Sequence, residues 1–191
     1  PLWQYGYGRF DQKANRFEDF KHLPHFTGTV WQGGEKLPDL KLGWASLRAN
    51  GGHPGDPAHA CVYRWMAPQA GRFAVAGTLK HASEHGNGVE GILSVPTRDL
   101  VLRWPVQHDE KETISEPFEV AAGEVVDLII DCRNDVAFDS FSWSIEIRDV
   151  DNPAGRWSMA EQFNVSLPSQ LTGWEMLSQA LLLSNEFQFV D

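Results

Sequence analysis

Cysteine is scarce in this sequence. Its 191 residues include only Cys61 and Cys132, too few for the disulfide framework that holds many small secreted domains together. Each lies in a strand-like apolar run, where a buried free thiol is the commoner state. We therefore expect two free thiols, with a single disulfide between them as the alternative.

Basic residues are also few. The 16 lysines and arginines are outnumbered by 26 aspartates and glutamates, which gives a formal net charge of -10 and a pI near 5.1. Binding to a polyanion requires clustered basic side chains that release counterions from phosphate groups. The composition therefore argues against nucleic acid and against an anionic membrane surface as partners.

Long apolar runs are missing as well. No stretch approaches the roughly 20 apolar residues that a membrane-spanning helix needs. The sequence opens at Pro1 without the charged and apolar regions of a secretory leader. We expect one compact domain with extensions, excised from a larger soluble protein and not inserted in a membrane.

Recognisable catalytic motifs are absent too. The sequence has no G-x-S-x-G, P-loop, H-E-x-x-H or dinucleotide-binding fingerprint, and no C-x-x-C-H for haem attachment. Electron transfer through haem therefore cannot reside in this chain. A pair of carboxylates could still form a glycosidase site, because such pairs arise from tertiary geometry that sequence spacing does not reveal.

Aromatic residues and strand-like alternation are what the sequence does contain. It has eight tryptophans and eleven phenylalanines, which can fill a β-sheet core or offer flat platforms to sugar rings. In "RFAVAGTLK", Phe73, Val75 and Leu79 share one face, the period of two expected of a half-buried strand. "EVVDLIIDC" and "SFSWSIEIR" repeat the pattern, and Trp143 is predicted to lie in the core. Short strands separated by turn signals predict a mainly β fold, an antiparallel β-sandwich of the jelly-roll type.

Changes in periodicity divide the chain into three regions. Residues 1–59, rich in Gly and Pro with only short strand-like pieces, are predicted to form a loop-rich wrap around the β-sandwich core of residues 60–150. Residues 151–191 are predicted to be a connector followed by one amphipathic α-helix. Thr172 and Glu175 form the capping-box signature that would begin this helix.

Several strings, taken in order, resemble a known family. They are "YGYG", "LPHFTG", "WQGG", "LGWASLRANGGHPG", "RWMAP", "GTLKHASEHGNGVEG", "VVDLIIDCRND", "DSFSW" and "ALLLSNEFQFVD". They resemble the C-terminal region of large exported planctomycete proteins that carry cytochrome c-like haem domains. The resemblance spans nearly the whole chain, and the β-rich part is similar to the jelly rolls of carbohydrate-binding modules.

The resemblance carries expectations about context. It implies export to the periplasm or cell surface as part of a larger protein, whose other domains would be partners. The final string looks like the terminus of a surrounding helical domain, which implies that the β module is an insertion.

The stretch "GTLKHASEHGNGVEG" is the first candidate site. Gly86-Asn87-Gly88 is a turn signal, because Gly and Asn tolerate the positive φ angles that tight connections require. The turn would leave His81, Glu84 and His85 on an exposed lip, available for hydrogen bonds to sugar hydroxyls. A zinc site at the two histidines is the alternative, although H-x-x-x-H is typical of metal binding mainly on a helix.

Tryptophans at predicted strand ends are the second candidate. Trp104 precedes Pro105 where a strand pattern stops, and Trp31 precedes Gln32-Gly33-Gly34. We expect both indole rings to stack against sugar rings, with Trp44 as a weaker third platform.

An acidic cluster in "DCRNDVAFDSF" is the third. Asp131, Asp135 and Asp139 would lie near the end of the sandwich, where carboxylate oxygens suit Ca²⁺, a hard cation. We therefore expect a structural calcium site, with a solvated acidic loop as the alternative.

These observations favour a noncatalytic module that binds a polysaccharide through loop aromatics and polar side chains. The alternative is a structural or docking domain within a larger cytochrome c-type protein, and a glycan hydrolase or lyase comes third. Exposure of the strand-end tryptophans would favour glycan binding, whereas their burial beneath the N-terminal wrap would favour the docking domain.

Overall fold

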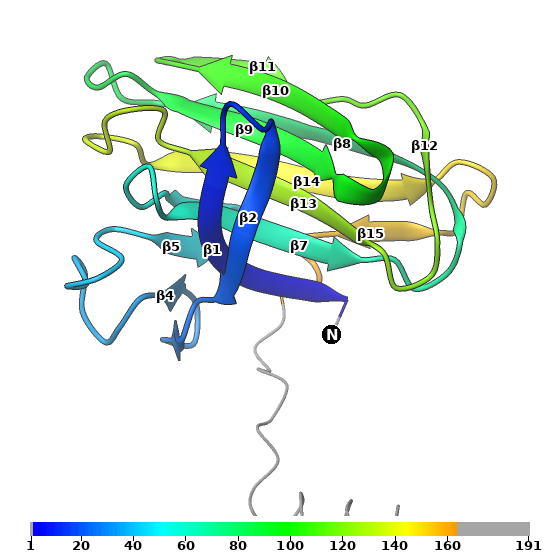
Figure 1. Cartoon of the computed structure of the whole chain (residues 1–191), viewed down its shortest axis with the longest axis horizontal. Helices are drawn as coiled ribbons and strands as arrows, with labels where there is room; N and C mark the ends of the chain where they lie inside the picture. The colour runs from blue at the N-terminus through cyan, green and yellow to red at the C-terminus, as the bar shows by residue number, and fades with distance from the viewer. Residues whose placement is uncertain (1, 164–191) are drawn as a thin grey trace, which may run out of the picture.

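Two antiparallel β-sheets packed face to face make up the described part of the chain (Figure 1). The structure, a computed structural model, describes residues 2–163. The predicted mainly β antiparallel fold is confirmed over this range. The helix predicted from Thr172 onward lies outside the described residues.

The first sheet has six strands. Their spatial order is β10 (Leu100–Val106), β9 (Val89–Val95), β13 (Val125–Asp131), β7 (Ala60–Met66), β1 (Trp3–Asp11) and β2 (Arg16–His22). A short 3-10 helix, Pro96–Arg98, joins β9 to β10.

The second sheet has nine strands. Its main path is β11 (Asp109–Glu112), β8 (Gly71–His81), β14 (Phe141–Asp149), β6 (Gly51–His53), β5 (Ser46–Arg48), β4 (Trp31–Gln32) and β3 (His25–Phe26). Two further strands extend it, β12 (Phe118–Val120) beside β8 and β15 (Arg156–Ser158) beside β14.

The core between the sheets contains the apolar faces that alternation predicts. Phe73, Val75 and Leu79 of β8 are buried, and Trp143 of the neighbouring β14 is fully buried. Across the interface, the ring of Trp65 on β7 packs against Phe73 with 5.2 Å between ring centroids. The two sheets therefore share one core, and the prediction that Trp143 belongs to it is confirmed.

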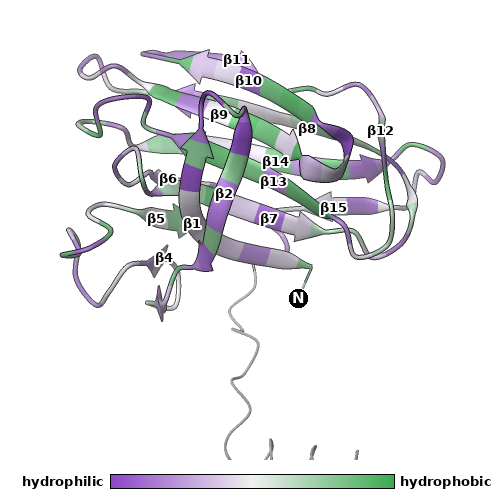
Figure 2. Ribbon diagram, in the orientation of Figure 1, coloured by the Kyte–Doolittle hydropathy of each residue, from purple (hydrophilic) through white to green (hydrophobic). Residues whose placement is uncertain are grey.

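The β1–β2 hairpin covers the outer face of the first sheet. It crosses in front of β7 and β13 (Figure 1), and in Figure 2 the mainly apolar β13 lies behind a largely hydrophilic β2. A second apolar cluster fills the space beneath it. This cluster consists of Phe10, Ala60, Val62, Ile92 and Ile129, with Phe17, Phe20 and Val101 at its edge. Strand β13 is consequently buried on both faces.

Two glycines allow β1 to lie so close to β2. A Cβ atom at Gly6 would collide with the ring of Phe20, and one at Gly8 would collide with the carbonyl oxygen of Glu18. The string "YGYG" therefore keeps alternate positions free of side chains where two backbones approach each other.

The three predicted regions share these sheets. The N-terminal range contributes a nine-residue strand, β1, which is inserted between β7 and β2 and is longer than the short pieces expected. Strand β15 pairs with β14, so the chain after residue 150 also extends a sheet. The outermost described segments, meaning the first and last described residues in chain order, contact each other. The indole N–H of Trp3 donates a hydrogen bond to Oε1 of Gln162 over 3.0 Å.

Candidate functional site

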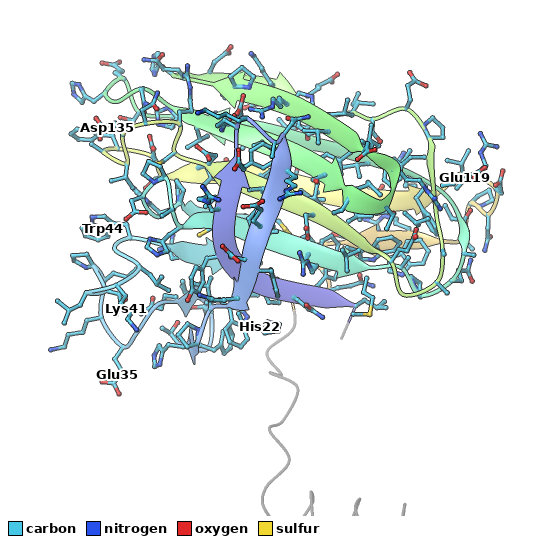
Figure 3. All side chains as sticks on the ribbon, in the orientation of Figure 1. His22, Glu35, Lys41, Trp44, Glu119 and Asp135 are labelled. Atoms are coloured by element: carbon cyan, nitrogen blue, oxygen red, sulfur yellow. The ribbon has the colours of Figure 1, made fainter. Side chains whose placement is uncertain are left out.

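Five connections gather at one end of the two sheets. Strands β4, β6, β8, β10 and β13 all run toward this end, because each is antiparallel to its neighbours. The connections are residues 33–45, 54–59, 82–88, 107–108 and 132–140. We call this region the loop end; it lies on the left in Figure 1, and Figure 3 shows Trp44 and Asp135 there, opposite Glu119.

The loop end concentrates exposed apolar side chains. Of the five large apolar residues that are exposed in the described chain, Leu40, Trp44 and Phe138 lie in its connections. Trp44 exposes 47% of its surface and Phe138 59%. Phe138 also has a φ of +68°, a left-handed backbone conformation that is uncommon for residues other than glycine. Strained, exposed aromatic residues of this kind are typical of functional loops.

An imidazole accompanies each of the two exposed aromatic rings. The ring centroids of His85 and Phe138 are 5.3 Å apart, and those of Trp44 and His53 are 6.2 Å apart. Exposed carboxylates lie in the same connections. We call the whole set the rim: Leu40, Trp44, His53, Glu84, His85, Asp135 and Phe138.

Strand pairing sets the separation of the two aromatic pairs. Phe141 of β14 is the partner of both Gly52 on β6 and His81 on β8. Neighbouring strands lie about 5 Å apart, so the β6 and β8 backbones are separated by about 10 Å. His53 is the last residue of β6, and His85 lies in the connection that follows β8. The two imidazoles therefore come from the strands on either side of β14.

The connection 82–88 is a turn, as its glycines predict. Gly86 and Gly88 have φ angles of +83° and +75°. A Cβ atom at Gly86 would collide with the carbonyl oxygen of Ala137, so only glycine permits this approach to the connection 132–140. The guanidinium of Arg133 donates to the carbonyl oxygen of Asn87 over 2.6 Å. The two connections therefore pack directly against each other.

His81 is not on the exposed lip where the sequence predicted it. Its side chain is fully buried, because it is the last inward-facing position of β8. Nδ1 accepts a hydrogen bond from the backbone N–H of His108 over 3.2 Å, and Nε2 donates to the carbonyl oxygen of Phe138 over 2.9 Å. Both ring nitrogens are thus occupied, which disfavours the zinc alternative. Glu84 and His85 are exposed, as predicted for a lip.

The three aspartates of the predicted calcium site have different environments. Asp135 is exposed, whereas Asp131 and Asp139 are buried. Burial, with the charge of Glu90, raises the pKa of Asp131 to about 6, although this carboxylate accepts a hydrogen bond from the backbone N–H of Arg133. Burial and the charges of Asp135 and Asp131 raise the pKa of Asp139 to about 7. Within residues 2–163, no group of three or more His, Cys, Asp or Glu side chains is arranged to hold a metal ion.

Two of the predicted tryptophan platforms are covered. Trp31 is only 3% exposed, because its ring packs against Phe26 at 4.7 Å and Tyr5 at 6.0 Å between centroids. Trp104 is half-buried, and its ring meets that of Trp143 at 6.4 Å. Trp31 is therefore a core residue in this structure, which corrects its expected role, and Trp44 is the most exposed of the three.

Sequence reasoning did not single out three rim residues, Leu40, His53 and Phe138. Phe138 is an isolated apolar residue in the polar string "NDVAFDS", between two strand patterns. A large apolar residue among turn-forming residues could have indicated a binding role for Phe138, because it belongs to no predicted strand or helix face that would bury it. Leu40, in "LPDLKLG", offered a similar but weaker signal.

A second surface feature lies on the outer face of the second sheet. A groove of about 400 Å³ has a floor of small side chains, including Ala76, Thr78 and Ser144. Ile114, exposed at 59%, forms part of its wall. None of the described residues that line the groove is aromatic. The groove therefore lacks the stacking surfaces that the rim has.

Comparison with known proteins adds no relative. No family model, no curated protein and no solved structure matches the chain. Among residues 2–163, no helix is long and apolar enough to cross a membrane. The fold and the geometry of the loop end are therefore the basis for assigning a function.

Proposed function

We propose that this chain is a noncatalytic carbohydrate-binding module that holds a polysaccharide at the rim of the loop end. The scaffold would be a β-sandwich of the jelly-roll type. In line with the family resemblance, we place the module within a larger exported protein, at the cell surface or in the periplasm.

The exposed aromatic rings of Trp44 and Phe138 are the observation that carries this proposal. Flat rings present apolar area with little side-chain entropy to lose, so they suit the C–H faces of sugars. His53, Glu84 and His85 would supply hydrogen bonds to hydroxyl groups. Such bonds largely replace bonds to water, so we expect them to orient the sugar and the rings to supply most of the affinity.

The net charge of -10 narrows the class of glycan. An acidic surface repels polyanions at long range, so sulfated or phosphorylated polymers are disfavoured. We therefore propose a neutral or weakly charged polysaccharide as the ligand.

Titration of the purified chain against a panel of soluble and insoluble polysaccharides tests the proposal. Trp44→Ala and Phe138→Ala should each weaken binding at least about fivefold, equivalent to about 1 kcal/mol. Both should leave the melting temperature almost unchanged, because the two rings are exposed.

Val150→Ala is the matched control. Val150 is also an exposed apolar residue, but it follows β14 at the opposite end of the sheets. This variant should bind like the wild type. Absence of binding to every polymer, or equal losses in the control and the rim variants, would exclude the rim as a glycan site.

A docking domain is the second candidate. It is supported by the burial of Trp31 against Tyr5 of β1, and by the hydrogen bond between Trp3 and Gln162, which brings the outermost described segments together. On this hypothesis the chain retains no polysaccharide and instead binds the remainder of its parent protein supplied in trans. Size-exclusion chromatography of the mixture would measure that association.

A glycan hydrolase or lyase is the third candidate. Asp131 and Asp139 have the raised pKa values that suit a general acid, but both carboxyls are buried and cannot reach a glycosidic bond in this conformation. Release of soluble sugar from the polysaccharide panel would favour this candidate over binding alone.

A further inference from the structure

Three buried oxygen atoms at the loop end have no hydrogen-bond donor. They are Oδ1 of Asn87 and both carboxylate oxygens of Asp139, and no residue among 2–163 donates to them. The Asp139 side chain is fully buried. Buried acceptors normally find a donor or an ion, because burial without a partner costs about 1–3 kcal/mol, and more for a charged group.

Both residues lie where the connections 82–88 and 132–140 pack together. The Asn87 side-chain amide donates to the carbonyl oxygen of Cys132 over 3.4 Å. Asp139 directly follows Phe138, whose Cβ atom lies 3.4 Å from the position that a Cβ atom would take at Gly86, the residue before Asn87. The sequence neighbours of Asn87 and Asp139 therefore contact each other across the two connections.

Among residues 2–163, no lysine or arginine forms a salt bridge with Asp139, although the charge of Arg133 lowers the pKa of this carboxyl. Nε2 of His81 is 3.9 Å from Oδ1 of Asp139 and already donates to the carbonyl oxygen of Phe138. The Arg133 guanidinium donates to the carbonyl oxygen of Asn87. Asp131 and Asp135 add negative charge to the same connection. The three carboxylates at this connection outnumber its one guanidinium, so the local charge attracts a cation, and a divalent one more strongly than a monovalent one.

We propose that Asp139 and Asn87 are side-chain ligands of a Ca²⁺ ion bound between the connections 82–88 and 132–140. Calcium is a hard cation that takes six to eight oxygen ligands in flexible geometry, so backbone carbonyls and water would complete its shell. In this assignment Asp131 and Asp135 supply negative charge without ligating. This differs from the three-carboxylate site that the sequence predicted.

The ion would fix the part of the rim that contains His85 and Phe138. An ion that binds only the folded chain stabilises it by mass action, whether or not a polysaccharide binds. The inference therefore does not rest on the proposed function and is tested without any sugar.

The test is thermal melting of the chain after treatment with EDTA and gel filtration, with CaCl₂ or MgCl₂ added back, together with calcium analysis by mass spectrometry. With millimolar CaCl₂ the wild type should bind about one ion per chain and melt about 3–5 °C higher, with a smaller effect of MgCl₂. Asp139→Asn should abolish most of this shift. Asn87→Ala should reduce it.

Asp135→Asn is the matched control, because it removes an exposed carboxylate from the same connection. It should keep most of the calcium response. If it loses as much as Asp139→Asn, the ion is held by diffuse surface charge and the assigned ligands are wrong. The assignment is also overturned if the wild type binds no calcium, or if Asp139→Asn melts higher than wild type in both EDTA and CaCl₂. The last result would show that Asp139 is buried as a neutral acid.

Discussion

Trp143 and Trp44 are tryptophans with different roles in this structure. Trp143 is fully buried, and its indole N–H donates to Oγ1 of Thr113 over 2.9 Å, so the polar atom of a core residue is satisfied. Trp44 is half exposed in a connection. Burial therefore separates the tryptophan that stabilises the fold from the one that is available to a ligand.

Replacing each tryptophan should change the free energy of unfolding in urea by very different amounts. Trp143→Ala should lower the free energy of unfolding by about 3–5 kcal/mol, because it leaves a large cavity and an unpaired hydroxyl at Thr113. Trp44→Ala should leave the free energy of unfolding almost unchanged. A loss below about 1 kcal/mol for Trp143→Ala would contradict its central place in the core.

The two cysteines give a prediction about reactivity. Cys61 and Cys132 are free and buried, and burial raises the pKa of each thiol to about 12. The thiolate is the reactive form, so neither residue should react with a thiol reagent in the native protein at pH 8. Unfolding in guanidinium should release two reactive thiols per chain. Labelling of the native chain at the rate of a free thiol would disprove their burial, and no thiols after unfolding would indicate a disulfide.

The β1–β2 hairpin packs against arginines of the first sheet. Arg64 on β7 donates to both carboxylate oxygens of the buried Asp127 on β13 over 2.6 and 2.8 Å, and its guanidinium lies 3.9 Å from the centroid of the Phe20 ring. Arg103 on β10 bonds to Asn15 at the hairpin tip and lies over Phe10. Two arginines of the first sheet thus hold the hairpin against the outer face of that sheet.

Removing Arg64 should reveal the cost of a buried, unpaired carboxylate. Arg64→Met should destabilise the chain by about 3–5 kcal/mol at pH 8, measured by urea unfolding. Burial already raises the pKa of Asp127, and without Arg64 it would rise further. The folded state then binds a proton that the unfolded state has released, so the loss of stability should grow as the pH rises from 5 to 8.

Arg9→Met is the control for this experiment. Arg9 pairs with Glu18 on the solvent side of the same hairpin, and such exposed pairs contribute little. The control should unfold almost like the wild type. Equal effects of the two variants would mean that the pairing of Arg64 with the buried carboxylate of Asp127 contributes no more than an exposed ion pair.

Alternation along the chain predicted the long strands but not the hairpin. The inward faces of β8 and β14 could be read directly, because a period of two follows from backbone geometry. The string "VVDLII" gave no sign of what covers its second face, since that cover comes from residues more than 100 positions earlier. The short strands β3 to β6 have too few residues for a recognisable period.

The exposure of a candidate site residue could be predicted only where its neighbours in the sequence determine that exposure. Glu84, His85 and Asp135 lie in connections with turn signals and are exposed, as their strings indicated. Trp31 and His81 also lie at strand ends, but Tyr5 covers the first, and the second faces inward beside Phe138. Contacts of this kind join distant parts of the chain, so spacing along the sequence cannot reveal them.

Across the whole molecule, the rim is separate from the contact between Trp3 and Gln162. The rim is built from connections between strands, whereas Trp3 and Gln162 belong to segments at the edge of the fold. A ligand at the rim would therefore contact none of the residues that join these segments. A substitution at one of these two features should therefore leave the other unchanged.

The contact between Trp3 and Gln162 also has a mechanical consequence. If the flanking chain were pulled from both sides, the load would enter and leave the module at neighbouring points. The force would first break the side-chain hydrogen bonds between these segments and would then act on β1 and β15, the strands next to them. Trp3 pairs with Trp65 at the end of β7 that lies away from the loop end, so the rim would keep its shape during these first steps.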